Sequence, residues 1–190
     1  MGAEIKFIIL GKVCNLLMNT KKMIHLAMLT SVGLGLHIIE SVIPNLFTAF
    51  APGAKLGLAN IVGLITLAIY GIKYALTVNL LRSFIGGIAS GVAISTIYSI
   101  SGAFVSTLLM WIIYRFFRKY FSLIGVSVFG ALGHNIAQLT VASIIIKNPK
   151  IFTYLPVLTL TSIFTGIFIG LTANYTLSKT KTNADYIIRT

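Results

Sequence analysis

Residues 93–114, AISTIYSISGAFVSTLLMWIIY, form a continuous stretch without a single charged side chain. A helix needs about 20 mainly apolar residues to cross the hydrocarbon core of a bilayer. The rest of the chain has the same character, because 57% of its 190 residues are hydrophobic and only 9% are charged. Soluble domains carry about 25% charged residues. The sequence therefore predicts an all-α integral membrane protein.

Six segments are apolar enough to be interpreted as transmembrane helices, and they cover about residues 23–43, 56–71, 74–90, 93–114, 122–146 and 151–175. The second and third are short, and only Gly71 and Lys73 divide them. We keep them separate because one helix over 56–90 would be too long for a bilayer.

Three regions follow from this division of the chain. Residues 1–22 are basic and predict an amphipathic segment in the membrane interface, residues 23–175 predict the six-helix transmembrane domain, and residues 176–190 predict a polar cytoplasmic tail. With both termini inside, 11 of the 15 Lys and Arg residues fall in cytoplasmic segments. The positive-inside rule then predicts cytoplasmic termini in a multi-pass protein of the cell (inner) membrane, surrounded by lipid.

Polar side chains within or at the ends of these helices need partners or a cavity, because charges in the apolar layer are costly. The candidate substrate-binding residues are Glu40, Lys55, Asn60, Arg82, His134, Asn135 and Gln138. His134 and Gln138 share one helix face by their four-residue spacing. Two interpretations stay open: a ligand cavity, or a buried ion-pair network of Glu40 with Arg82 or Lys55 that holds the bundle together.

Residues 44–55, PNLFTAFAPGAK, are apolar, broken by proline and too short to span. Irregular backbone at membrane depth is tolerated where protein covers it or where it lines a cavity. The segment is either a connector or a lid over an outward-facing pocket. The candidate lid residues are Pro44, Phe47, Phe50, Pro52 and Gly53.

Small residues recur every four positions on three predicted helices, and such stripes let helix backbones approach closely in lipid. The stripes are Ala27, Ser31 and Gly35; Ser95, Ser99, Ala103 and Thr107; and Ser162, Gly166, Gly170 and Asn174. Each stripe serves internal packing or docks another membrane subunit. The first stripe is the best docking candidate, because the basic N-terminal segment lies beside it.

Signatures of catalysis and of cofactor binding are missing. The sequence contains no phosphate-binding loop, no H-E-x-x-H and no G-x-S-x-G. Asp185 is the only aspartate, so the aspartate clusters that hold magnesium in prenyl-chain synthesis cannot form. The single Cys14 excludes a cysteine-based metal site. We therefore expect no enzyme activity, no cofactor and no metal; the net charge of +12 reflects only 3 acidic residues, so we expect no nucleic-acid partner.

Two motifs carry a family resemblance: PGAKLGLAN at residues 52–60 and GHN-x-x-Q at residues 133–138. With these motifs the sequence resembles the Gx transporter family, which is also called heptaprenyl diphosphate synthase component I. The resemblance covers about residues 23–174. More distantly, the family resembles the substrate-binding S components of energy-coupling factor vitamin transporters.

This resemblance implies an S-component-like bundle of six helices with an outward pocket, gated by the loop after the first helix. It also implies docking to a transmembrane scaffold subunit, which works with ATPase subunits, through an A-x-x-x-A pattern on the first helix. Here the matching positions are Ala27 and Ser31, so both side chains stay small.

Our leading hypothesis is a membrane subunit that captures a small anionic solute, such as a vitamin, a flavin or a prenyl or quinone precursor. The alternative is a membrane accessory subunit of a heptaprenyl diphosphate synthase or a quinone-related system.

Overall fold

The computed structural model describes residues 2–42, 57–89, 91 and 93–189, with side chains described within 20–40, 57–89, 91 and 93–180. The described chain is all-helical and contains no strand. Its elements are α1 (Gly2–Val42), α2 (Asn60–Tyr70), α3 (Ile72–Ala89), α4 (Ala93–Phe116), α5 (Leu123–Ile146), the 3-10 helix η1 (Pro149–Tyr154) and α6 (Leu155–Arg189). The all-α prediction is confirmed.

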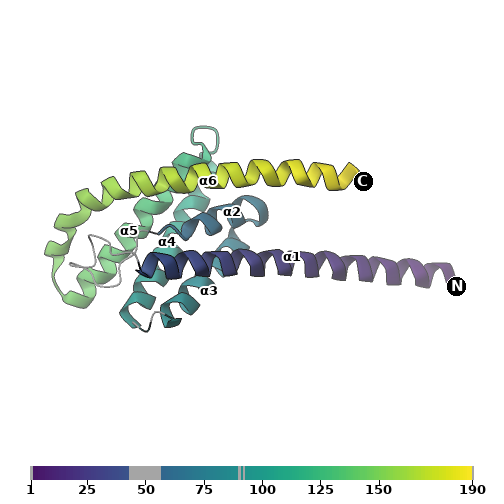
Figure 1. Ribbon diagram of the computed structural model, residues 1–190, viewed down its shortest axis with the longest axis horizontal. Coiled ribbons are helices and arrows are strands. Elements are labelled where there is room, and N and C mark those ends of the chain that lie inside the picture. The colour runs from purple at the N-terminus through teal and green to yellow at the C-terminus, as the bar shows by residue number, and fades with distance from the viewer. Residues whose placement is uncertain (1, 43–56, 90, 92, 190) are drawn as a thin grey trace.

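Both chain ends leave the bundle on the same side, as Figure 1 shows. Helix α1 has 41 residues and α6 has 35, so they are about 60 and 50 Å long at 1.5 Å per residue. A hydrocarbon core is about 30 Å thick. Both helices therefore extend past the other four (Figure 1).

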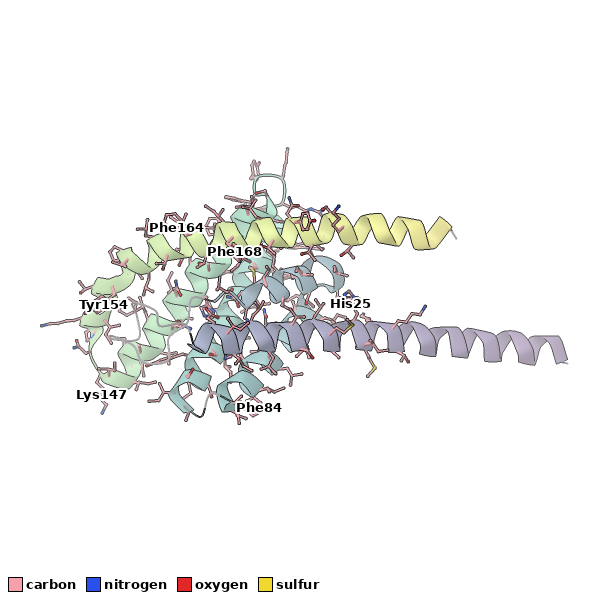
Figure 2. The ribbon with its side chains drawn as sticks, in the orientation of Figure 1. His25, Phe84, Lys147, Tyr154, Phe164 and Phe168 are labelled. Atoms are coloured by element: carbon pink, nitrogen blue, oxygen red, sulfur yellow. The ribbon has the colours of Figure 1, made fainter. Side chains whose placement is uncertain are left out.

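We call the side where both termini emerge the basic end of the bundle. Lys22 lies over the ring of Tyr74 there, 3.6 Å from its centroid, and His25 Nδ1 is 2.6 Å from the hydroxyl of Tyr70. Figure 2 places Lys147 and Tyr154 at the opposite end from His25.

Helix boundaries differ from the predicted ones at three places. Helix α1 runs through residue 22 and α6 runs through residue 176 without a break, so the expected interfacial segment and polar tail both continue transmembrane helices. No proline or glycine follows Gly170 to end α6. Helix α2 begins only at Asn60, because Gly57 has a φ of 84°, which an α-helix cannot accommodate.

Helix α2 lies at the centre of the bundle and touches all five other α-helices. Every residue from Asn60 to Leu67 is buried. Leu64 and Thr66 are both 0% exposed, so opposite faces of the helix are covered. A helix of 11 residues is about 16 Å long, half the hydrocarbon thickness.

Four of the predicted spans are long and apolar enough to cross a membrane, and they cover Thr20–Glu40, Ala93–Phe116, Leu123–Ile146 and Pro149–Thr180. The multi-pass membrane class is thereby supported for four helices. Helices α2 and α3 are present as separate helices on either side of Gly71, as predicted, but they do not reach the same standard of length and hydropathy.

Candidate functional site

Arg82 is the centre of a buried polar network and is only 2% exposed. Its Nε donates to Asn79 Oδ1 at 3.0 Å, one turn earlier on α3, and its Nη2 donates to Asn60 Oδ1 on α2 at 2.8 Å. A buried guanidinium is tolerated where such acceptors replace water. Two amides on neighbouring helices therefore hold the one cation in the middle of the bundle.

The network extends from Asn60 and Asn79 to two further helices. Asn60 Nδ2 lies 3.2 Å from His134 Nδ1 on α5, and Gln138 Nε2 lies 2.9 Å from the other ring nitrogen of the same histidine. In the other direction Asn79 Nδ2 donates to Thr107 Oγ1 on α4 at 2.7 Å. A continuous chain of hydrogen bonds thus joins α4, α3, α2 and α5.

Glu40, at the end of α1, brings the negative charge to this region. Its Oε1 accepts hydrogen bonds from the backbone N–H groups of Gly57 and Leu58, the latter at 3.2 Å. Its carboxylate also attracts the buried Arg82 electrostatically. The side chain is 3% exposed, so α1 contributes a buried acid at the start of α2.

Glycines make room for the large members of the network. A Cβ at Gly33 on α1 would lie 2.8 Å from Arg82 Cδ, and one at Gly102 on α4 would lie 2.6 Å from His134 Cε1. The tightest contact is at Gly63 on α2, where an added Cβ would lie 1.9 Å from Asn79 Nδ2. The polar side chains occupy volumes that any larger residue would fill.

Five predicted substrate-binding residues are brought together: Glu40, Asn60, Arg82, His134 and Gln138. Asn135 points elsewhere, because its Nδ2 donates to Ser162 Oγ on α6 at 2.7 Å. Lys55 and the lid residues Pro44, Phe47, Phe50, Pro52 and Gly53 lie outside the described residues.

Two members of the network, Asn79 and Thr107, were not among the predicted substrate-binding residues. Asn79 precedes Arg82 by three residues, which places both on one face of α3. An amide at that spacing from a buried arginine is a usable signal. For Thr107 the only signal was its place in a small-residue stripe, and nothing in the sequence paired it with Asn79.

The three small-residue stripes have different surroundings. Ser95, Ser99, Ala103 and Thr107 on α4 are all buried, and so are Ser162, Gly166 and Gly170 on α6. On α1, Ala27 and Ser31 are exposed, and a Cβ at Gly35 would meet nothing within 4 Å. Met28 and Val32 beside them are 63% and 57% exposed. Of the three stripes, the one on α1 is the most exposed.

A cavity of about 690 Å³ opens at the basic end, away from the polar network. It lies between the end of α2, the turn from α4 to α5, and α6. Its lining comprises Ala68, Ile69, Tyr114, Arg118, Phe121, Ser122, Leu123, Asn174, Leu177, Ser178 and Thr180. No sequence pattern predicted a cavity here, since its lining residues are far apart in the chain and ordinary for a membrane interface.

Chemically, the network offers one cation, one carboxylate, amides and an imidazole, and so it is suited to binding by hydrogen bonds and charge. Among the described residues, no group of three or more His, Cys, Asp or Glu side chains could hold a metal ion. The fold and this site define a multi-helix membrane protein with a hydrogen-bonded polar centre.

Comparison with known proteins narrows this class to a family. Residues 29–176 match the model of heptaprenyl diphosphate synthase component I. The chain belongs to this family, as its two motifs predicted. Neither a curated protein nor a solved structure matches the chain.

Proposed function

We propose that the protein is the solute-capturing membrane subunit of a transporter, similar to the S components of energy-coupling factor systems. The observation that carries this proposal is the buried Arg82, held by Asn60 and Asn79 and attracted by Glu40. An ionisable residue inside a membrane domain is expensive to keep and marks a functional site by default. Arg82 is the cation through which this site would attract a small anionic solute.

The site is connected to the predicted lid through the backbone. Gly57 and Leu58 follow the segment 44–55 closely in sequence, and both donate to Glu40. A movement of that segment would therefore act on the acid that attracts Arg82. We propose that solute enters from the side of the lid, which the positive-inside rule makes the outer side of the cell membrane, with both termini in the cytoplasm.

Docking to a scaffold subunit would use α1. On this helix Ala27 and Ser31 are exposed and Gly35 is half-buried, whereas the α4 stripe and Ser162, Gly166 and Gly170 of the α6 stripe are buried within the bundle. Small residues on a lipid-facing surface allow a partner helix to approach closely. A scaffold with ATPase subunits would supply the energy that this chain, without a nucleotide-binding motif, cannot generate.

The family description favours a second candidate, a membrane accessory subunit of heptaprenyl diphosphate synthase. In this case the polar network only fixes the helices, and the basic end contacts a soluble synthase subunit. The two functions differ in what deletion does. Loss of an accessory subunit lowers long-chain prenyl product even when the medium supplies every transported solute, whereas loss of a transporter subunit does not.

Mass spectrometry of small molecules that co-purify with the full-length protein tests the leading proposal. We expect an anionic solute with the unchanged protein and its loss in Arg82→Gln, which keeps hydrogen-bonding atoms but removes the charge. Ser99→Ala is the matched control, because the Ser99 hydroxyl is buried without a hydrogen-bond partner. A folded protein that is empty under all conditions, or a solute retained by Arg82→Gln, would contradict the proposal.

A further inference from the structure

The cavity at the basic end is separate from the polar network. Asn60 and Ile69 lie at opposite ends of α2, about 14 Å apart along its axis. Asn60 belongs to the network, and Ile69 lines the cavity. Whatever the cavity binds therefore does not depend on the solute site proposed above.

The walls of the cavity combine two kinds of surface. Ala68, Ile69, Leu123 and Leu177 are apolar, and they come from α2, α5 and α6. Arg118 adds a cation from the turn between α4 and α5. Its guanidinium lies 5.2 Å from the ring centroid of Tyr114, so the ring holds it by a cation–π contact without neutralising it. This lining suits a ligand that is apolar at one end and negative at the other.

Among the described side chains, the cavity has cations nearby and no acid. Among the side chains that the structure describes, Glu40 is the only carboxylate, and it lies near the start of α2, away from the cavity. Lys119 and Lys179 are chain neighbours of the lining residues Arg118 and Ser178. An anion entering this cavity meets cations and no described carboxylate.

The first turn of α5 adds a second attraction for an anion. Its first N–H groups have no acceptor within the helix, and the helix dipole places positive potential there. The N-cap residue Ser122 makes no side-chain capping hydrogen bond, and both Ser122 and Leu123 line the cavity. The 24-residue helix α5 thus begins at the cavity, and the Ser122 side chain does not cap its first N–H groups.

Helices α2 and α4 end at the same place, and their carbonyl groups would repel an anion if they were free. The carbonyl of Leu67 accepts from Gly71 N–H at 3.0 Å, and that of Ile113 accepts from Phe117 N–H at 2.9 Å. The Phe117 carbonyl accepts from Tyr120 and Phe121. These three carbonyl groups are hydrogen-bonded within the chain, and Arg118 and the first turn of α5 would have to outweigh the negative ends of the two helix dipoles.

We propose that this cavity binds the phosphate or diphosphate head of an anionic amphiphile. The head group lies between Arg118 and the first turn of α5, and the apolar part lies against Ile69 and Leu177. A volume of about 690 Å³ is that of a site for a small organic ligand, larger than a phosphate group alone needs. The amphiphile comes either from the membrane, as an anionic phospholipid, or from the aqueous phase, as a prenyl-type diphosphate.

Binding to the full-length protein distinguishes the two sources. In one arm the protein, in neutral detergent, is titrated with geranyl diphosphate, geraniol and inorganic pyrophosphate. In the other arm, native mass spectrometry counts phosphatidylglycerol retained after transfer from nanodiscs that also contain phosphatidylcholine. The tighter ligand of the two arms identifies the source. Geraniol and pyrophosphate each carry half of the proposed chemistry, so both should bind at least about tenfold more weakly than the amphiphile.

Arg118→Gln should weaken amphiphile binding about tenfold, since it removes a charge-assisted contact. Arg115→Gln is the matched control, because Arg115 is exposed in the last turn of α4 and is not in the lining. Leu177→Trp, which fills the cavity and keeps Arg118, should weaken binding as well. Equal losses in Arg118→Gln and Arg115→Gln, pyrophosphate that binds as tightly as geranyl diphosphate, or no binding in either arm would each overturn the proposal.

Discussion

Replacing Gly63 by alanine tests whether the polar network depends on the close approach of α2 and α3. The added Cβ would lie 1.9 Å from Asn79 Nδ2 and 2.6 Å from its Cγ, well inside contact distance. Asn79 is 0% exposed and has no free space to enter. It must shift, and its bonds to Thr107 at 2.7 Å and from Arg82 at 3.0 Å must then lengthen or break.

The expected loss of stability follows from three contributions. The two side-chain hydrogen bonds, one from α3 to α4 and one within α3, contribute about 0.6 kcal/mol each. Forcing a methyl group into a filled core costs about 1–3 kcal/mol. Alanine returns up to about 1 kcal/mol through its higher helix propensity. The free energy of unfolding of Gly63→Ala should therefore fall by about 1–3 kcal/mol.

Gly35→Ala on α1 is the control, because its Cβ would meet nothing within 4 Å. Only the helix-propensity contribution applies there, so this variant should be neutral or up to about 1 kcal/mol more stable. Unfolding of both purified variants in mixed micelles measures the difference. If Gly63→Ala were as stable as Gly35→Ala, α2 and α3 would not be held at the distance on which the network depends.

Further substitutions test other contacts. Asn60→Leu keeps the approximate volume but removes a hydrogen-bond partner of both Arg82 and His134. The free energy of unfolding in micelles should fall by about 1–3 kcal/mol, and an unchanged value would mean that neither bond is formed. Ser31→Leu lies on an exposed face and should change the melting temperature little while abolishing pull-down of a scaffold subunit; early melting would contradict the outward stripe. In Gly166→Ala the new Cβ would lie 2.5 Å from the α5 backbone, so the free energy of unfolding should fall by about 1–3 kcal/mol. An unchanged melting temperature would mean that α5 and α6 lie further apart.

The fold was predictable to the extent that hydrophobic length decides it. Residues 93–114 and 122–146 were placed within two residues of α4 and α5, because their ends are marked by charges and by Ser122. The start of α2 was wrong by four residues, since the left-handed backbone at Gly57 depends on tertiary bonds to Glu40. Hydropathy cannot show such a bond.

The polar cluster was predictable as a set but not as a network. Burial cost alone selected Arg82 and His134, because the sequence offers so few polar groups within apolar segments. An ion pair with Glu40 does not describe the whole arrangement, since hydrogen bonds also join Arg82 to amides on α2 and α3. Which helix face meets which depends on close packing at glycines such as Gly63 and Gly102, and spacing along one chain does not determine that pairing.

The short length and the burial of α2 from Asn60 to Leu67 have a consequence for the way the protein is made. A helix of 11 residues is too short to be recognised as a membrane span during synthesis, and the next helix carries Arg82, which opposes insertion. Neither α2 nor α3 is therefore suited to enter the bilayer alone. We expect the two to enter together as a hairpin turning at Gly71, with the amide of Asn60 accepting from the guanidinium at 2.8 Å. On this view, a hydrogen bond at the centre of the molecule would favour the pairing of α2 and α3 before they enter the bilayer.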